Sequence, residues 1–260
     1  MNVTLITGAS AGIGEGFARR LAKEGRDLVL VARSEKALHE LCDELMLKHG
    51  ITAHYIVADL CEHDGPQRVM DEIAEHAMTV DTLINNAGFG SAGDFATLDR
   101  ERELAMIDLN IRALVELTHR CLEGMRERRR GTIVNVSSAA GFQPLPFMAT
   151  YAATKSFVSS FSEAVAEENR PFGIQVLALC PGSTDTNFFS AAKMDRAIQV
   201  KGQQTVEQVI DTAMNAIASG RTKVVSGFAN KIGAMMGKYV PNVISRRAVA
   251  RILAPRYRQQ

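Results

Sequence analysis

The chain has 260 residues, a formal net charge of +1 and 46% hydrophobic residues. This hydrophobic content predicts a substantial core and argues against disorder, and the small net charge argues against nucleic acid as the main ligand. The length suits one large α/β domain or two small ones. The longest uncharged run, 132–154, is too polar and too interrupted by proline to span a bilayer.

The four cysteines are scattered, with no CxxC pair and no metal-ligand spacing to the six histidines. They are expected to be buried, reduced thiols, which fits a cytosolic setting. The first residues run directly into a glycine-rich turn, so no signal peptide is predicted. We therefore expect a cytoplasmic protein that holds no metal.

The N-terminal pattern is an apolar strand (VTLI), a glycine turn (TGASAGIG) and a helix (EGFARRLAKEG). Gly8, Gly12 and Gly14 let the backbone turn tightly and approach a ligand, and amides at the helix start can face a phosphate. The spacing is G-x-x-x-G-x-G and not the common dinucleotide fingerprint G-x-G-x-x-G. The strand before the turn and the helix after it supply the context that phosphate binding requires.

A second strand, 27–32, ends at Arg33 and Ser34. NAD-binding proteins often place an acid at this position, about 20 residues past the glycine turn, to hold the ribose hydroxyls. A guanidinium and a hydroxyl suit a 2′-phosphate instead, so the sequence predicts NADP(H) over NAD(H). The alternative is a solvated arginine at the end of a strand.

Two more helices, 35–49 and 67–77, alternate with two more strands. The strand 53–58 ends in Asp59 and Leu60, and an acid at the carboxyl end of a parallel strand lies on the ligand-binding edge of such a sheet. The strand 81–85 runs into a small, polar turn along which a cofactor could pass, formed by Asn86, Ala87 and Gly88. The asparagines could also simply fix the turn.

One long helix is expected over 100–125, with Asn110 in its interior. Asparagine is a poor residue inside a helix, so its side chain should bend the helix or form a hydrogen bond inward. The basic run 126–130 precedes Gly131 and a strand. It therefore fits a favourably charged helix C-terminus better than a nucleic-acid site.

The stretch 131–155 forms a strand that ends near Ser138, a turn-rich segment, and a helix that begins at Tyr151. Tyr151 and Lys155 lie four residues apart on one helical face. A phenol titrates near pH 10, and a nearby ammonium would lower its pKa toward a useful range. A serine hydroxyl facing both could hold a substrate oxygen. The alternative is an ordinary surface pair and a turn serine.

A sixth strand, 173–179, a helix, 206–219, and a short last strand, 223–226, complete the alternating pattern. This alternation predicts an α/β, single-domain, doubly wound Rossmann fold, with a parallel seven-stranded sheet and helices on both faces. Residues 1–226 are expected to form this domain, and 227–260 a basic amphipathic extension packed on it. From Arg221 onward the chain has nine Lys and Arg and no acid. The tail should cover the cleft, contact a second subunit or rest on an anionic membrane surface.

Taken together, these patterns resemble the short-chain dehydrogenase/reductase family over almost the whole chain, within its NADP(H)-preferring branch. The matching residues include the glycine turn after Thr7, the Asn86-Ala87-Gly88 turn, Asn110, Ser138, Tyr151-x-x-x-Lys155 and Pro181-Gly182 with Thr186. The tail is similar to bacterial members of unassigned substrate. Some NADP-preferring relatives carry a basic residue inside the glycine turn, where this chain has Ser10 and Ala11, so Arg33 would provide most of the selectivity.

The resemblance implies a role for each matching residue. Tyr151 would be the acid–base, Ser138 would steady the substrate oxygen, Lys155 would bind the nicotinamide ribose and lower the Tyr151 pKa, and Asn110 would hold a water in a proton relay. Cofactor binding would fall to Gly8, Ser10, Gly12, Ile13, Gly14, Arg33, Ser34, Asp59, Leu60, Asn86, Ala87, Gly88, Tyr151, Lys155, Pro181, Gly182, Thr184 and Thr186.

The implied activity is NADP(H)-dependent interconversion of a carbonyl and an alcohol. Mostly apolar residues near the catalytic groups, including Phe142, Phe147 and Phe188, favour a hydrophobic carbonyl substrate. The family's habit implies a homodimer or homotetramer through the helices 100–125 and 151–168. The same site could instead reduce an imine or an enone or catalyse an epimerisation, and the chain could act as an NADP(H) sensor or a membrane-surface module.

Overall fold

A computed structural model describes residues 1–186, 203–227, 230–233 and 242–257. Its centre is one parallel sheet of seven strands in the order β3-β2-β1-β4-β5-β6-β7. The strands are β1 (Asn2–Thr7), β2 (Leu28–Ala32), β3 (Ala53–Val57), β4 (Thr79–Asn85), β5 (Gly131–Val136), β6 (Ile174–Cys180) and β7 (Lys223–Val225). The predicted doubly wound α/β fold is confirmed.

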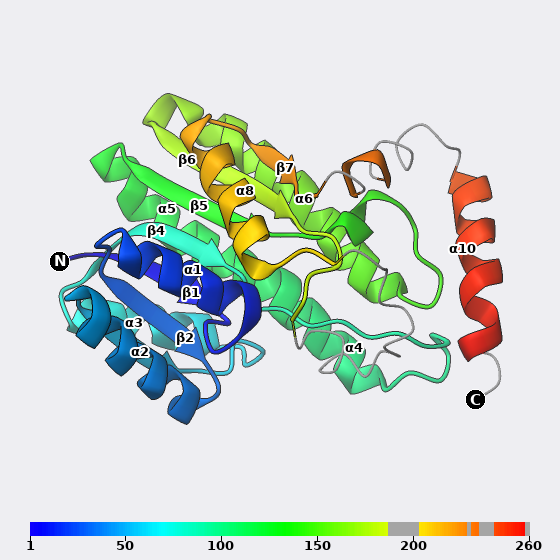
Figure 1. Cartoon of the computed structure of the whole chain (residues 1–260), viewed down its shortest axis with the longest axis horizontal. Helices are drawn as coiled ribbons and strands as arrows, with labels where there is room; N and C mark the ends of the chain where they lie inside the picture. Colours follow the sequence, from blue (N-terminus) through cyan, green and yellow to red (C-terminus); the bar gives the residue numbers. More distant parts are fainter. Residues whose placement is uncertain (187–202, 228–229, 234–241, 258–260) are drawn as a thin grey trace.

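Helices cover both faces of the sheet (Figure 1). They are α1 (Gly12–Lys23), α2 (Glu35–His49), α3 (Gly65–Glu75), α4 (Arg100–Ile107), α5 (Leu114–Arg128), α6 (Ala149–Asn169), α8 (Val206–Ala218) and α10 (Asn242–Tyr257). Two 3-10 turns, η2 (Ala139–Phe142) and η3 (Arg170–Phe172), and a π-helical segment, η1 (Asp108–Ala113), lie between them, and residues 230–233 are also helical.

The strands β1 to β6 each divide their apolar side chains between two cores because successive residues point to opposite faces of a sheet. In β1, Ile6 packs with α1, α2 and α8, whereas Leu5 packs with α3, α5 and α6. In β2, Leu30 joins the first cluster and Val31 the second. A continuous apolar run in the sequence therefore buries both of its faces, as central parallel strands do.

The order of the strands reverses at β1, because β2 and β3 extend the sheet on one side and β4 on the other. A ligand binds to sheets of this kind in the crevice outside the carboxyl ends of the strands where the order reverses. The reversal brings the turn after β1 next to the turn after β4. The Cβ that an alanine at Gly8 would carry lies only 2.9 Å from Ala87 Cα.

The expected uninterrupted helix over 100–125 is wrong. The segment is α4, the π-helical turn η1 and then α5, which continues to Arg128. Asn110 lies in η1 and is 1% exposed. Its amide bonds inward, as the next subsection describes, and the wider π turn holds it in the helix at that point.

The described part of the C-terminal tail contacts the domain in two regions. α10 stands apart from the sheet (Figure 1), but Leu253 is buried and the Tyr257 ring stacks on Phe147 at 5.5 Å between centroids. Asn230 lies against Gly182, in the turn that follows β6. Among the described residues, no helix combines the length and the apolar character that crossing a membrane would require.

Candidate active site

A cleft of about 650 Å³ opens at the carboxyl ends of the strands. Its lining combines the turns after β1, β2, β3, β4, β5 and β6 with the start of α6. These turns carry almost every residue that the sequence singles out for cofactor binding. Most of the predicted site residues, which are far apart in the sequence, therefore meet in one cavity.

The turns after β1 and β4 are locked together. Thr7 Oγ1 accepts hydrogen bonds from the Asn86 and Ala87 amides, each at 3.0 Å. Asn86 Nδ2 donates to Thr7 O at 3.0 Å and to Gly8 O at 3.1 Å. Gly8 has φ +64°, a left-handed conformation that glycine adopts without strain. These contacts fix the side of the glycine turn that faces the turn after β4, and its other side lines the cleft.

The end of the cleft next to Arg33 is polar and open. Arg33 follows β2, has a side chain that is 77% exposed, and lies with Nη1 3.7 Å from Asp59 Oδ2. Asp59 also accepts a hydrogen bond from the Cys61 amide at 2.9 Å. A contact of this length between exposed groups is weak. The Arg33 guanidinium is therefore available to an anion at the cleft edge.

The catalytic candidates meet at the opposite end. Ser138 follows β5, and its side chain hydrogen-bonds to that of Tyr151. Burial raises the pKa of Tyr151 to about 12, and the bond to Ser138 acts in the opposite direction. Burial lowers the pKa of Lys155 to about 8. The lowering of the Tyr151 pKa expected from Lys155 is not seen in this structure, because burial of the phenol dominates.

Among the described residues, the Lys155 ammonium bonds to the backbone and has no acidic partner. Its Nζ donates to Val136 O at 2.8 Å and lies 5.9 Å from the Tyr151 ring centroid. Ser137 Oγ donates to Lys155 O at 2.6 Å and bonds to Ser159 Oγ at 2.8 Å. These buried bonds fix α6 against the end of β5. The positions of Tyr151 and Lys155 relative to Ser138 are set in this way.

Asn110, in η1, is buried just outside the lining of the cleft, which includes its neighbour Leu109. Its Nδ2 donates to Phe89 O at 3.0 Å and to Thr154 Oγ1 at 3.1 Å, and its Oδ1 accepts from the Phe89 amide at 3.1 Å. An alanine at Gly88 would bring its Cβ within 2.8 Å of Asn110 Oδ1. Asn110 therefore connects the turn after β4 with α6, directly below the catalytic candidates.

The cleft brings together most, but not all, of the predicted site residues. The predicted cofactor residues line it except Gly14, which packs beneath it against Gly8 O. Phe142 and Phe147 lie outside its lining: the Phe142 ring lies below Lys223 Nζ at 4.9 Å, and Phe147 faces Tyr257. Proximity in sequence did not indicate which way these rings turn. Phe188 lies outside the described residues.

Several lining residues were not among the predicted site residues, including Leu109, Met148 and Asn230. Met148 immediately precedes α6, and Leu109 immediately precedes Asn110. Predicted site residues close to them in the sequence therefore pointed to these two parts of the chain. Asn230 comes from the tail, and its Nδ2 donates to Ser226 O at 2.8 Å. A cover for the cleft was one of the three roles expected for the tail, but no local pattern in the sequence singled out Asn230.

A dinucleotide fits the residues present. The glycine turn lines the cleft through Gly8, Ser10 and Gly12, and its other side packs so closely that a Cβ added at Gly8 or Gly14 would lie within 3 Å of neighbouring protein atoms. The amides at the start of α1 face this turn, and a helix N-terminus favours phosphate. An exposed guanidinium lies at one end of the cleft and the Tyr151–Ser138 pair at the other.

We expect the substitution Lys155→Met to change the pH dependence of stability. Because burial lowers the Lys155 pKa from 10.5 to about 8, the folded state binds fewer protons than the unfolded state between those values. The free energy of unfolding of the wild type should therefore rise with pH relative to that of the variant, by on the order of 3 kcal/mol across the window. Urea denaturation of both proteins at pH 7 and pH 10 measures it, and a difference that is independent of pH would contradict it.

Comparison with known proteins gives a consistent result. The family model for short chain dehydrogenases matches residues 2–197. Sulfoacetaldehyde reductase 2 of Chromohalobacter salexigens is 38% identical over 189 residues, which are 72% of this chain and 74% of the relative. 17-beta-hydroxysteroid dehydrogenase type 3 of Mus musculus is 30% identical over 260 residues, covering 97% of this chain and 81% of the relative.

Solved structures agree with this family. A short-chain dehydrogenase from Sphingobium yanoikuyae in complex with NADPH superposes with a TM-score of 0.83 at 32% identity, over 92% of this chain and 93% of the other. The bulky-bulky ketone specific alcohol dehydrogenase from Comamonas testosteroni superposes with a TM-score of 0.77 at 30% identity, over 86% of each chain. With its fold, its cleft and these relatives in agreement, the chain belongs to the short-chain dehydrogenase/reductase family.

Proposed function

We propose that the protein is an NADP(H)-dependent oxidoreductase that interconverts a carbonyl and an alcohol. The observation that carries the proposal is the hydrogen-bonded Tyr151–Ser138 pair, beside the buried Lys155, in a cleft whose other end presents Arg33. The bound nicotinamide supplies or accepts the hydride. The protein's own residues orient the reactants and handle the proton.

Tyr151 is the proposed proton donor and acceptor. With a pKa of about 12, its phenol is protonated at neutral pH, which suits proton donation to the oxygen of a carbonyl during reduction. Ser138 holds that oxygen by a hydrogen bond, and Lys155 and Asn110 keep α6 and the turn after β4 in place.

The proposed cofactor is NADP(H), because Arg33 and Ser34 occupy the end of β2 where an NAD-binding protein often has an acid. We expect Arg33→Ala to lower the ratio of kcat/KM for NADPH to that for NADH about 10- to 100-fold, because a charge-assisted bond to the 2′-phosphate is lost. Arg100→Ala, at an 86% exposed arginine outside the cleft lining, is the control and should leave the ratio unchanged. An unchanged ratio in Arg33→Ala would remove Arg33 as the source of the preference.

The proposed substrate is a hydrophobic carbonyl compound. The cleft beside Tyr151 is lined by Phe89, Ala139, Ala140, Leu145 and Met148. The test is oxidation of NADPH, followed by absorbance, against a panel of aldehydes, ketones, quinones and steroids, with NADH in parallel. Turnover by the wild type with a panel member supports the proposal. NADPH binding without turnover on any of them would favour a cofactor sensor.

We propose that the protein forms a homodimer or homotetramer through the helical face that exposes apolar residues. On α6, Phe157 is 40% exposed and stacks on Phe161 at 5.7 Å, and on α4, Leu104 and Ile107 are 49% and 41% exposed. Light scattering measures the assembly. A monomer would overturn this proposal.

The proposed role of the tail, 227–260, is to cover the cleft of the same domain. The contacts of Asn230 and Tyr257 support this role over a membrane-surface contact. Co-sedimentation with anionic liposomes, with and without residues beyond Val225, tests the membrane alternative. We also propose a cytoplasmic location. Its support is that the four cysteines are all free thiols, as is usual for proteins in a reducing compartment.

A further inference from the structure

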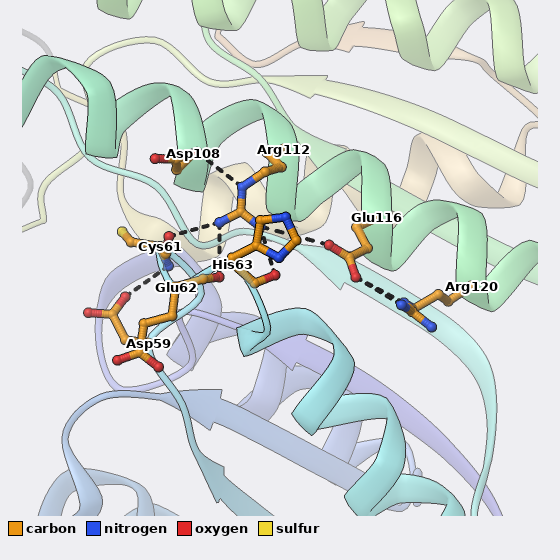
Figure 2. A network of polar contacts seen from close by, with 8 residues as sticks. All are labelled: Asp59, Cys61, Glu62, His63, Asp108, Arg112, Glu116 and Arg120. Carbon is orange, nitrogen blue, oxygen red and sulfur yellow. Dashed lines mark hydrogen bonds and ion pairs between the residues drawn. The ribbon is translucent and has the colours of Figure 1, made fainter.

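Arg112 makes an unusual set of contacts outside the cleft (Figure 2). It lies in η1, and its guanidinium donates to the carbonyl oxygens of three consecutive residues in the loop after β3. Nη2 reaches Cys61 O at 2.8 Å and Glu62 O at 2.9 Å, and Nη1 reaches His63 O at 3.1 Å. One side chain therefore binds three consecutive carbonyl groups of the same backbone turn.

The guanidinium is itself held in place. Arg112 Nε donates to Asp108 Oδ1 at 3.0 Å, and Nη1 lies 3.8 Å from Glu116 Oε2. Glu116 in turn pairs with Arg120 at 3.0 Å. The planar fork of an arginine can serve several acceptors at once, which a lysine ammonium on a flexible stem does not match. The side chain is also largely covered, at 28% exposure.

The loop that Arg112 holds borders the cofactor cleft. Asp59 and Leu60 immediately precede the three residues whose carbonyls Arg112 binds. They line the cleft next to Arg33, where the adenine of the proposed cofactor would lie, and we call this the adenine-side end. Asp59 Oδ1 accepts from the Cys61 amide, so the carboxylate and the held turn form one unit. Cys61 Sγ also contacts Ala105 O at 3.7 Å, which adds a second link from this loop to α4.

The segment η1, from which the Arg112 side chain extends, also carries the catalytic candidate Asn110. Arg112 and Asn110 are two residues apart in η1, and Leu109 lines the cleft. The π turn therefore presents Asn110 to the turn after β4 and Arg112 to the loop after β3. Two walls of the same cleft are joined through one turn.

We propose that Arg112 is a positioning residue for the cofactor, which holds the adenine-side wall formed by Asp59 and Leu60 through the carbonyls of Cys61, Glu62 and His63. This inference rests on the proposed dinucleotide binding. Its effect should fall on the adenosine half of the cofactor, because the held loop borders that half alone. The contacts of Arg112 in the described part of the chain are with Asp108, Glu116 and the loop carbonyls, away from the lining beside Tyr151.

The experiment compares Arg112→Met with Arg128→Met. Among the described residues, Arg128 lies in α5 and donates to a backbone carbonyl, Val80 O at 3.0 Å, but to no carbonyl of the loop after β3, so it is a matched control. Amide hydrogen exchange of the peptide containing residues 59–64 reports on the loop without any ligand. Calorimetric binding of 2′,5′-ADP reports on the adenine-side wall without any turnover. Arg112→Lys, which keeps the charge, serves if the methionine variant does not fold.

We expect faster exchange of the loop in Arg112→Met and about tenfold weaker binding of 2′,5′-ADP, with Arg112→Lys weakened at least about threefold and Arg128→Met like the wild type. Exchange unchanged in Arg112→Met, or 2′,5′-ADP affinity within about twofold of the wild type, would overturn the inference. Failure of the proposed function has a different signature: the wild type itself would not bind 2′,5′-ADP, and the positioning role would fall with it.

Discussion

Tyr151→Phe is expected to lower kcat about 10²- to 10⁴-fold, the range for loss of a positioned proton donor. The ring is 7% exposed and phenylalanine keeps its shape, so α6 should stay in place. Binding of NADPH should remain within about threefold of the wild type, because the cradle for the cofactor is built mainly from the turns after β1, β2 and β4.

Steady-state rates with the best panel substrate and calorimetric binding of NADPH measure the two effects separately. Tyr55→Phe is the control, because Tyr55 lies on β3 and packs edge-on against His39, 5.8 Å between centroids. That variant should keep the wild-type rate. A Tyr151→Phe enzyme that retains its rate would mean that another group moves the proton.

Gly14→Ala is expected to remove NADPH binding, with affinity lower by about 100-fold or more, and to reduce the free energy of unfolding by about 1–3 kcal/mol. The added Cβ would lie 2.3 Å from Gly8 O and 2.5 Å from Asn86 Nδ2. The first neighbour is backbone, and the second is the amide that locks the turns after β1 and β4 together. Relief of the clash must therefore move the glycine turn itself.

Thermal unfolding and calorimetry with NADPH provide the measurements. Gly124→Ala is a matched control, because Gly124 also lies inside a helix and its added Cβ would meet only the flexible end of Arg128, at 2.7 Å. That substitution should leave binding unchanged and raise stability by up to about 1 kcal/mol through helix propensity. If Gly14→Ala behaved like this control, close packing under the glycine turn would not be needed.

The fold could be predicted from sequence because its signals are local. Each strand of the sheet is a short apolar run followed by small or polar residues, and β1 leads directly into the glycine turn. In a parallel sheet the carboxyl ends of the strands share one edge, so residues such as Ser138 and Asn86 were expected to converge. The cleft brings them together.

Other features depend on distant partners, which a local pattern does not contain. The break at η1 depends on the bonds of Asn110 to Phe89 and Thr154, and only the presence of an asparagine in the helix gave a hint. The orientation of Phe147 depends on Tyr257, more than 100 residues away in sequence. The Tyr151 pKa depends on burial, which spacing alone does not reveal.

The π turn also limits how this part of the sequence can change over evolution. A single extra residue separates η1 from an ordinary α-helix, and each residue of an α-helix advances the chain by about 100°. Loss of one residue between α4 and α5 could restore a regular helix at little cost to folding. It would rotate either Asn110 or Arg112 away from its partners. Substitutions can therefore accumulate on the exposed side of this segment, whereas its length is fixed by two contacts on opposite sides of the turn.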